Sequence, residues 1–186
     1  MHTTQLSTSD GNYIVRQAES GDASSALEFF KRVRSQSPYL LLELDEGIQD
    51  TAVQERQFRS MQLEHKQAVF LALHLEKVIG FAGISRGVFK RNAHSASIAV
   101  AVDTAHQRCG VGSLLMQAVF SWAHEKRLTR VELTVATENA AAIKLYERHD
   151  FVTEGTKRKS FRIGERLVDE QLMARVFDGL RYPDRR

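Results

Sequence analysis

Two glycines, Gly110 and Gly112, lie two residues apart in the turn Gln107–Ser113, between an apolar segment and an amphipathic one. Glycine has no Cβ, so the backbone at these positions can approach a ligand closely. The residues that follow repeat apolar side chains with a helical period: Val111, Leu114, Leu115, Ala118, Val119 and Trp122. The first N–H groups of a helix lack intrahelical partners and carry the positive end of the dipole. The turn is therefore a candidate anion site, and phosphate is the anion we expect.

The glycine spacing excludes two common nucleotide-binding motifs. It is not the Gly-x-Gly-x-x-Gly of dinucleotide folds, and no Lys-Ser/Thr follows the glycines as it does in triphosphate loops. A nucleotide-binding α/β domain is therefore disfavoured. The plain structural alternative is a helix start that needs its glycines only for close packing.

The turn resembles the Q/R-x-x-G-x-G/A signature of the GNAT superfamily, N-acetyltransferases that use acetyl-coenzyme A. One departure is the absence of a proline before Gln107, where Thr104 and Ala105 stand. The resemblance implies that the coenzyme is bound along the strand end and the turn, with the N–H near Val102 stabilising an oxyanion. The residues so implicated are Val100, Val102, Gln107, Arg108, Cys109, Gly110, Val111, Gly112 and Ser113. A catalytic thiol at Cys109 is the weaker interpretation, because Cys109 holds a variable place in the motif.

A second segment, Asn139–Phe151, is similar to the family motif N-x-x-A-x-x-x-Y-x-x-x-G-F. Asn139 is a good N-cap, and Tyr146 lies two helical turns later on nearly the same face. The resemblance implies that both contact the coenzyme and that the Tyr146 phenol is the catalytic acid for the leaving thiolate. The alternative is an ordinary amphipathic helix with a core tyrosine. Asp150 replaces the usual glycine, but aspartate tolerates the left-handed conformation better than most residues.

The order of elements predicts an α/β (α+β) fold. We expect a mixed, mostly antiparallel sheet of six to seven strands flanked by about four helices. We also expect a right-handed strand–helix–strand crossover with parallel strands that splay apart at the centre. The expected strands are 13–17, 68–75, 78–85, 95–102, 131–135, 152–162 and 166–177. The expected helices begin at Asp22, with Ala26, Leu27, Phe30 and Val33 on one face, at Gln49, at Val111 and after Asn139.

Chain length, net charge and cysteine count indicate the general class of this protein. We expect a single domain, 1–186, with loose tails at 1–11 and 179–186. A net charge of +3 is too small to argue for nucleic acid. Cys109 is the only cysteine, so no internal disulfide forms and a reducing, cytoplasmic location fits. We expect no membrane segment and no metal.

The expected reaction moves an acetyl group directly to a primary amine in a ternary complex. The acceptor is left open between a small molecule and a protein N-terminus or lysine, and a homodimer is also left open. By resemblance, Tyr39 and Glu43 are candidates to face the amine, and the alternative is that both side chains simply pack or are solvated. The central strand has no carboxylate, so His94, Glu132 and Glu43 are named as substitute bases and none is selected.

The C-terminal third has a softer resemblance to polyamine and ribosomal-protein acetyltransferases, through Glu154-Gly155, Gly164, Asp169 and Met173. The rival function is a non-catalytic acetyl-CoA-binding regulatory module. The presence of both Asn139 and Tyr146 favours an enzyme.

Overall fold

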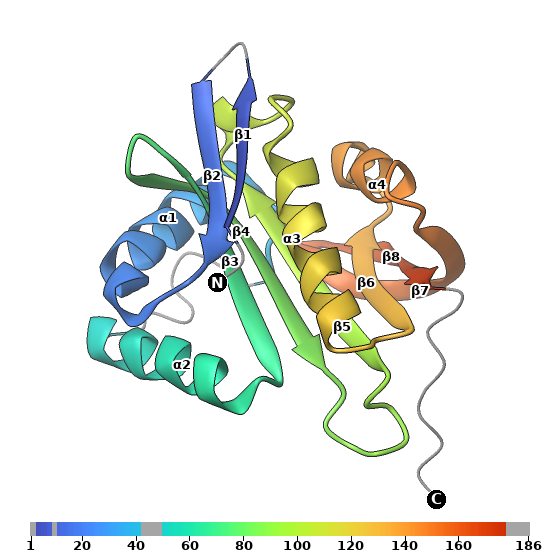
Figure 1. Ribbon diagram of the computed structural model, residues 1–186. Helices are drawn as coiled ribbons and strands as arrows, with labels where there is room; N and C mark the ends of the chain where they lie inside the picture. The colour runs from blue at the N-terminus through green and yellow to red at the C-terminus, as the bar shows by residue number, and fades with distance from the viewer. Residues whose placement is uncertain (1–2, 9–10, 42–49, 178–186) are drawn as a thin grey trace, which may run out of the picture. The chain divides into compact units, whose positions relative to one another are not determined.

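A computed structural model describes residues 3–8, 11–41 and 50–177 of the chain. The chain divides into two compact units, Met1–Ile84 with Ala99–Phe120, and Ser85–Ile98 with Ser121–Arg186. Figure 1 draws the helices and strands, coloured by residue number. Strand β5 (Ser95–Val102) and helix α3 (Val111–Glu125) each contribute residues to both units. The single domain expected from the sequence stays a prediction.

The first unit contains a sheet in the order β1-β2-β3-β4-β5. Its strands before β5 are β1 (Thr3–Thr8), β2 (Gly11–Gln17), β3 (Gln67–His74) and β4 (Lys77–Arg86). The prediction of a loose tail over residues 1–11 is wrong for Thr3–Thr8, which pairs along its whole length with β2. The sequence of Thr3–Thr8 is mostly polar and has no apolar alternation that would predict a strand. Its backbone pairing with β2 makes it one. Among the described residues the sheet therefore has eight strands, more than the six to seven predicted.

Two helices complete the core of the first unit. Helix α1 (Ala23–Gln36) buries Phe29, whereas Leu27 and Phe30 of the predicted face are only half-buried. Asp22 precedes α1 as predicted, but its carboxylate binds Arg16 at 2.7 Å and accepts from the N–H of Glu19 at 2.7 Å, and it makes no capping bond to α1. Helix α2 (Thr51–Glu64) buries only Gln54 and Phe58, as its weak apolar pattern indicated. One buried cluster of this unit consists of Ala18, Ala26, Phe29, Val33, Phe58, Val69, Leu71, Leu73 and Val78.

The β3–β4 hairpin and Gly80 set the surface on which α3 packs. The two turn residues are Leu75 and Glu76, both left-handed with φ of 48° and 62°, as in a type I′ turn. The predicted hairpin is confirmed, with its turn one residue earlier than expected. A Cβ built on Gly80 would lie 3.1 Å from Leu115 Cδ1 and 3.1 Å from Ala72 Cβ. Glycine at this position therefore leaves room for the Leu115 side chain of α3.

The second unit contains the order β5-β6-β8-β7. Its remaining elements are β6 (Arg130–Ala136), α4 (Ala140–Glu147), β7 (Val152–Ile163) and β8 (Arg166–Val176). The predicted parallel pairing of β5 with β6 is confirmed, and the other pairs of this unit are antiparallel. Ser95–Ser97 pair with Arg130–Glu132, although both strands continue beyond these residues. The predicted splay of the two strands stays a prediction.

The β7–β8 ribbon contains a wide bulge. Lys157 pairs with Glu170 and Phe161 with Val168, so three residues of β7 face the single residue Asp169. Lys159 lies in the bulge with φ of 51°, and its N–H donates to Asp169 Oδ1 at 2.8 Å. The bulge is therefore anchored by a specific contact and is an ordered feature of the ribbon.

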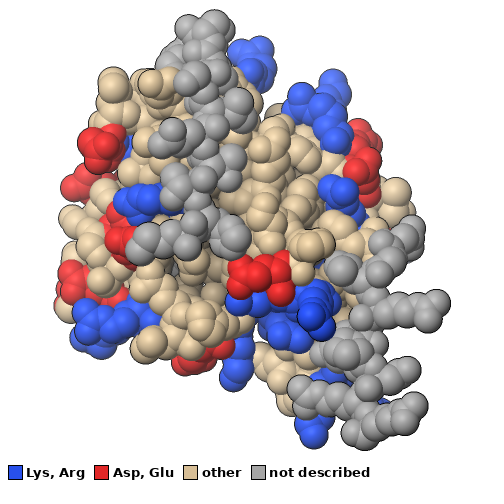
Figure 2. All heavy atoms as spheres, in the orientation of Figure 1, with Lys and Arg blue, Asp and Glu red and all other residues tan. Residues whose placement is uncertain are grey.

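Charged side chains of both signs are interspersed on the face drawn in Figure 2. This distribution agrees with the small net charge of +3. None of the helices in the described part of the chain is long and apolar enough to cross a membrane. Within the described residues, no group of three or more His, Cys, Asp or Glu side chains is placed to hold a metal ion.

Candidate active site

The segment Gln107–Ser113, called the coenzyme turn below, connects β5 to α3 through a short 3-10 helix, η2 (Thr104–His106). Arg108 and Gly110 have left-handed φ of 61° and 84°. A Cβ built on Gly110 would meet no heavy atom within 4 Å, so the space beside this backbone is open. Leu114 N–H donates to Gly110 O at 3.1 Å, and the three N–H groups before Leu114 have no partner within the helix. The turn thus combines open space with the positive end of a helix.

Side chains of the coenzyme turn make local contacts. Gln107 Nε2 donates to the carbonyl of Val102 at 3.2 Å, which ties the turn to the end of β5. The thiol of Cys109 donates to Gln107 O at 3.4 Å. A carbonyl partner cannot remove the thiol proton, so this geometry gives no support to a nucleophilic cysteine. Val100 and Val102 are half-buried on β5.

The second motif forms the N-terminus of α4 in the second unit. Asn139 Oδ1 accepts a hydrogen bond from Ala142 N–H at 3.2 Å, so the predicted N-cap is confirmed. Asp150 is left-handed with φ of 62°, and Phe151 N–H donates back to Tyr146 O at 3.1 Å. Aspartate thus takes the left-handed position at the helix end, as predicted for a residue replacing glycine.

Tyr146 is the buried side chain of α4, with 6% of its surface exposed. Its ring centroid lies 5.7 Å from that of Phe151. Burial raises the pKa of Tyr146 to about 12, so the phenol keeps its proton at neutral pH. The role of this phenol toward a ligand stays a prediction.

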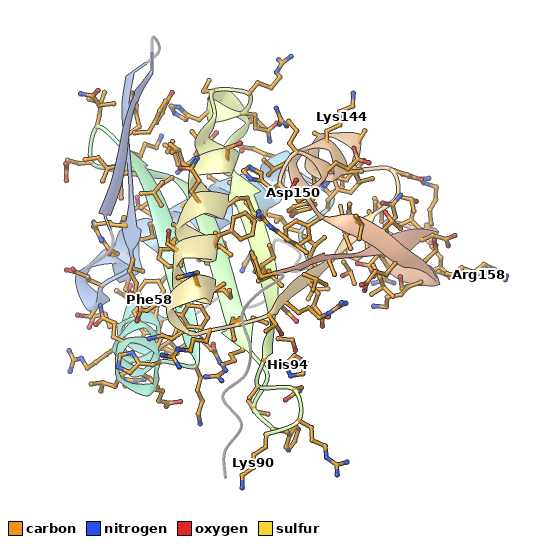
Figure 3. The ribbon with its side chains drawn as sticks, turned by 45° about the vertical axis from the view of Figure 1, so that its right-hand side comes forward. Phe58, Lys90, His94, Lys144, Asp150 and Arg158 are labelled. Atoms are coloured by element: carbon orange, nitrogen blue, oxygen red, sulfur yellow. The ribbon has the colours of Figure 1, made fainter. Side chains whose placement is uncertain are left out.

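The substitute bases lie in unfavourable or undescribed positions. His94 directly precedes β5, next to the loop that bears Lys90 (Figure 3). At about 3.3 Å per residue, it is roughly 26 Å along the strand from Val102, too far to act on the same atoms. Glu132 accepts a hydrogen bond from Arg130 Nε at 2.7 Å. Glu43 lies outside the described residues. Tyr39 is half-buried just after α1, and its role toward an acceptor stays a prediction.

Asp103 is the residue of this region that the sequence analysis missed. It directly follows β5, is only 4% exposed, and its carboxylate binds Arg32 Nε at 2.6 Å. Burial alone would raise its pKa, but hydrogen bonds from Arg32, Ala105 and Gln36 outweigh burial and lower it. The available signal was an aspartate between an apolar strand and a turn, where it caps η2.

Fold and motifs place the chain in a known class. Residues 31–151 match the model of the Acetyltransferase (GNAT) family, and the chain belongs to this family. One relative is the L-amino acid N-acetyltransferase AaaT of Escherichia coli (strain K12), 39% identical over 101 residues. That match covers 53% of this chain and 62% of the relative, which is less than two thirds of the relative's length.

Two solved structures share the fold. One is the acetyltransferase of GNAT family from Streptococcus pneumoniae, with 28% identity, a TM-score of 0.85, and coverage of 89% of this chain and 99% of that one. The other is YncA from Salmonella typhimurium with its cofactor acetyl-CoA, with 20% identity and a TM-score of 0.80. It covers 92% of this chain and 98% of its own. The predicted mixed, mostly antiparallel α/β fold is confirmed.

Proposed function

We propose that this protein is an acetyl-CoA-dependent N-acetyltransferase that acts on a primary amine by direct transfer in a ternary complex. The observation that carries the proposal is the coenzyme turn, where left-handed Arg108 and Gly110 lead into the N-terminus of α3 beside open space. Family membership and the acetyl-CoA complex of a protein with the same fold support it. With no internal disulfide available, we expect the protein to work in the cytoplasm.

The coenzyme pyrophosphate is assigned to the N–H groups of Val111, Gly112 and Ser113. These groups lack intrahelical partners and lie at the positive end of the α3 dipole. We assign the rest of the pyrophosphate site to Gln107, Arg108, Cys109 and Gly110. We assign the remaining coenzyme contacts to Val100 and Val102 on β5 and to Asn139 and Tyr146 of the second motif.

In the transfer step, the amine nitrogen attacks the thioester carbonyl carbon and the carbon–sulfur bond breaks. The N–H of Val102 donates to the carbonyl oxygen as that oxygen gains negative charge. Tyr146 donates its proton to the leaving sulfur, a role that its raised pKa of about 12 permits at neutral pH. A primary amine with a pKa of about 10 must first lose one proton, and we assign that proton to solvent. The nitrogen loses a second proton as the amide forms, and this proton restores the Tyr146 phenol.

The acceptor proposed for first testing is the α-amine of an L-amino acid, because the name of the E. coli relative specifies this class. Polyamines and protein N-termini are the other acceptors to include. The competing function is a regulatory module that binds acetyl-CoA without turnover. Release of free coenzyme thiol, dependent on both protein and acceptor, separates the two functions.

The test measures thiol release with L-amino acids, spermidine and an N-terminal peptide at saturating acetyl-CoA. We expect Tyr146→Phe to lower kcat by about 10²-fold, because a positioned acid is lost while the ring stays. Coenzyme affinity should change little. Tyr13→Phe removes the phenol of another buried tyrosine, 2% exposed on β2, and serves as the matched control with normal kcat.

Two results would count against this proposal. Acetyl-CoA binding without thiol release for any acceptor would favour the regulatory module. Normal turnover in Tyr146→Phe would remove the acid role from Tyr146 while leaving the transferase assignment intact.

A further inference from the structure

The buried carboxylate of Asp103 connects helix α1 to the backbone that enters the coenzyme turn. Asp103 Oδ2 accepts from Arg32 Nε at 2.6 Å, and Oδ1 accepts from Gln36 Nε2 at 3.2 Å. The same Oδ1 accepts from the N–H of Ala105 at 3.2 Å. Gln36 also contacts the backbone directly, since its Oε1 accepts from Thr104 N–H at 3.1 Å. Two side chains of α1 thus hold successive residues after β5.

The same network is fixed to the neighbouring strand. Arg32 Nη2 donates to the carbonyl of Val78 at 2.7 Å, and Asp103 N–H donates to the carbonyl of Ile79 at 2.9 Å. Val78 and Ile79 belong to β4. One guanidinium therefore binds the carboxylate and the strand at once, a fork geometry that lysine does not have.

The network lies, in sequence, between two groups of the proposed active site. Asp103 directly follows Val102, which is proposed to donate to the acetyl oxygen, and it stands four residues before Gln107, the first residue of the coenzyme turn. We infer that Arg32 and Gln36 are positioning residues that act through Asp103 to fix the Val102 N–H and the coenzyme turn relative to each other. This inference rests on the proposed function, because it assigns a task to the same turn.

The opposite charges of Arg32 and Asp103 give a second reason why the two side chains are paired at this site. Asp103 puts a carboxylate four residues before the turn that is proposed to bind an anion, and the Arg32 cation compensates for its charge. Without Arg32, the buried carboxylate would be unpaired and would repel phosphate through a medium of low dielectric constant. Arg32 thus keeps the turn in place and keeps its surroundings free of uncompensated negative charge.

The variants are Asp103→Asn, Arg32→Lys and Arg32→Ala in the full chain. In Asp103→Asn, the new amide would present an NH₂ group to a site where three donors converge, so the network must rearrange. Arg32→Lys keeps the charge but cannot bind Asp103 and Val78 through one planar group. The matched control is Asp22→Asn, which breaks a pair of 2.7 Å in the same unit whose partners have comparable exposure.

Three quantities are measured beside steady-state rates: the Kd of acetyl-CoA by calorimetry, the Tm, and the hydrogen exchange of amides from Ala105 to Ser113. A displacement of about 1 Å can cost about 10²-fold in catalysis, so we expect kcat/KM to fall by about 10- to 10²-fold in Asp103→Asn, with weaker acetyl-CoA binding. Exchange from Ala105 to Ser113 should accelerate. The kcat/KM and the acetyl-CoA affinity of Arg32→Lys should lie between those of the wild type and those of Arg32→Ala. Asp22→Asn should lower the Tm without changing the Kd of acetyl-CoA or the hydrogen exchange of these amides.

Unchanged acetyl-CoA affinity in Asp103→Asn and Arg32→Lys would overturn the inference. An equal loss of affinity in Asp22→Asn would also overturn it, because the effect would then follow general stability. If the wild type itself does not bind acetyl-CoA, the proposed function fails. Hydrogen exchange then decides the positioning role: faster exchange only in the Asp103 and Arg32 variants supports it, and unchanged exchange refutes it.

Discussion

Substitution of Gly110 by alanine isolates a single property of the coenzyme turn. Gly110 has φ of 84°, and a Cβ there would meet no heavy atom within 4 Å, so the cost of Gly110→Ala in the free protein is a backbone cost. A left-handed L-residue is disfavoured by about 1–2 kcal/mol. For a chain of this length, that energy corresponds to a fall in Tm of about 2–8 °C.

Coenzyme affinity should fall as well. The added methyl group occupies the open space beside the turn, and a relaxed turn must be forced back into its original shape on binding. The backbone cost of about 1–2 kcal/mol is divided between the two effects. The part that the free protein keeps as strain lowers the Tm, and the part that it avoids by relaxing the turn raises the Kd of acetyl-CoA, by at most about 5- to 30-fold. Calorimetric titration and thermal unfolding of the same preparation measure both effects.

Gly164 provides the control for this experiment. It is also left-handed, with φ of 57°, has the same open surroundings, and lies in the turn between β7 and β8. Gly164→Ala should lower Tm in the same range while leaving acetyl-CoA affinity unchanged. Equal affinities of Gly110→Ala and the wild type, or equal losses in both alanine variants, would refute the assignment of pyrophosphate to this turn.

Two further predictions concern stability. Gly80→Ala places a Cβ 3.1 Å from Leu115 Cδ1 and 3.1 Å from Ala72 Cβ. The cost of overpacking, about 1–3 kcal/mol, should exceed the gain of about 0.4–1 kcal/mol from a less flexible unfolded chain, so the variant should be less stable. A higher stability of the variant in urea would contradict this. Burial raises the pKa of Tyr146 to about 12, above the ordinary value of about 10 that it has in the unfolded chain. The unfolded chain therefore ionises first, and the wild type should lose on the order of 3 kcal/mol of stability as the pH rises from about 10 to about 12. Tyr146→Phe should lack this loss, and identical pH profiles of the two proteins would rule out the burial argument.

Strong local patterns allowed the sequence to predict the strand at Ser95–Val102, the start of α3 and the cap at Asn139. Each depends on residues close in sequence: an apolar run, a helical period and a side chain that bonds three residues ahead. The left-handed Asp150 was predictable for the same reason, since its conformation is set by the helix end beside it.

Features that depend on distant partners were not predictable. The Arg32–Asp103 contact joins residues 71 positions apart, and nothing near Asp103 identifies α1 as its partner. Asp22 has the type and position of a helix cap, but Arg16 on β2 competes for its carboxylate. Strand β1 is polar, so only its pairing with β2 defines it. A tertiary partner decided the outcome in each case.

The bulge in β7 has a consequence for self-association. Among the described residues β7 is the last strand of the sheet order, and long regular edge strands recruit further chains into a growing sheet. Here Lys159 interrupts the regular backbone, and Arg158 projects away from the ribbon (Figure 3). Bulges and cationic side chains are two of the devices by which natural sheets block edge-to-edge addition. The bulge and the cationic side chains of β7 should therefore disfavour the addition of a further strand at this edge.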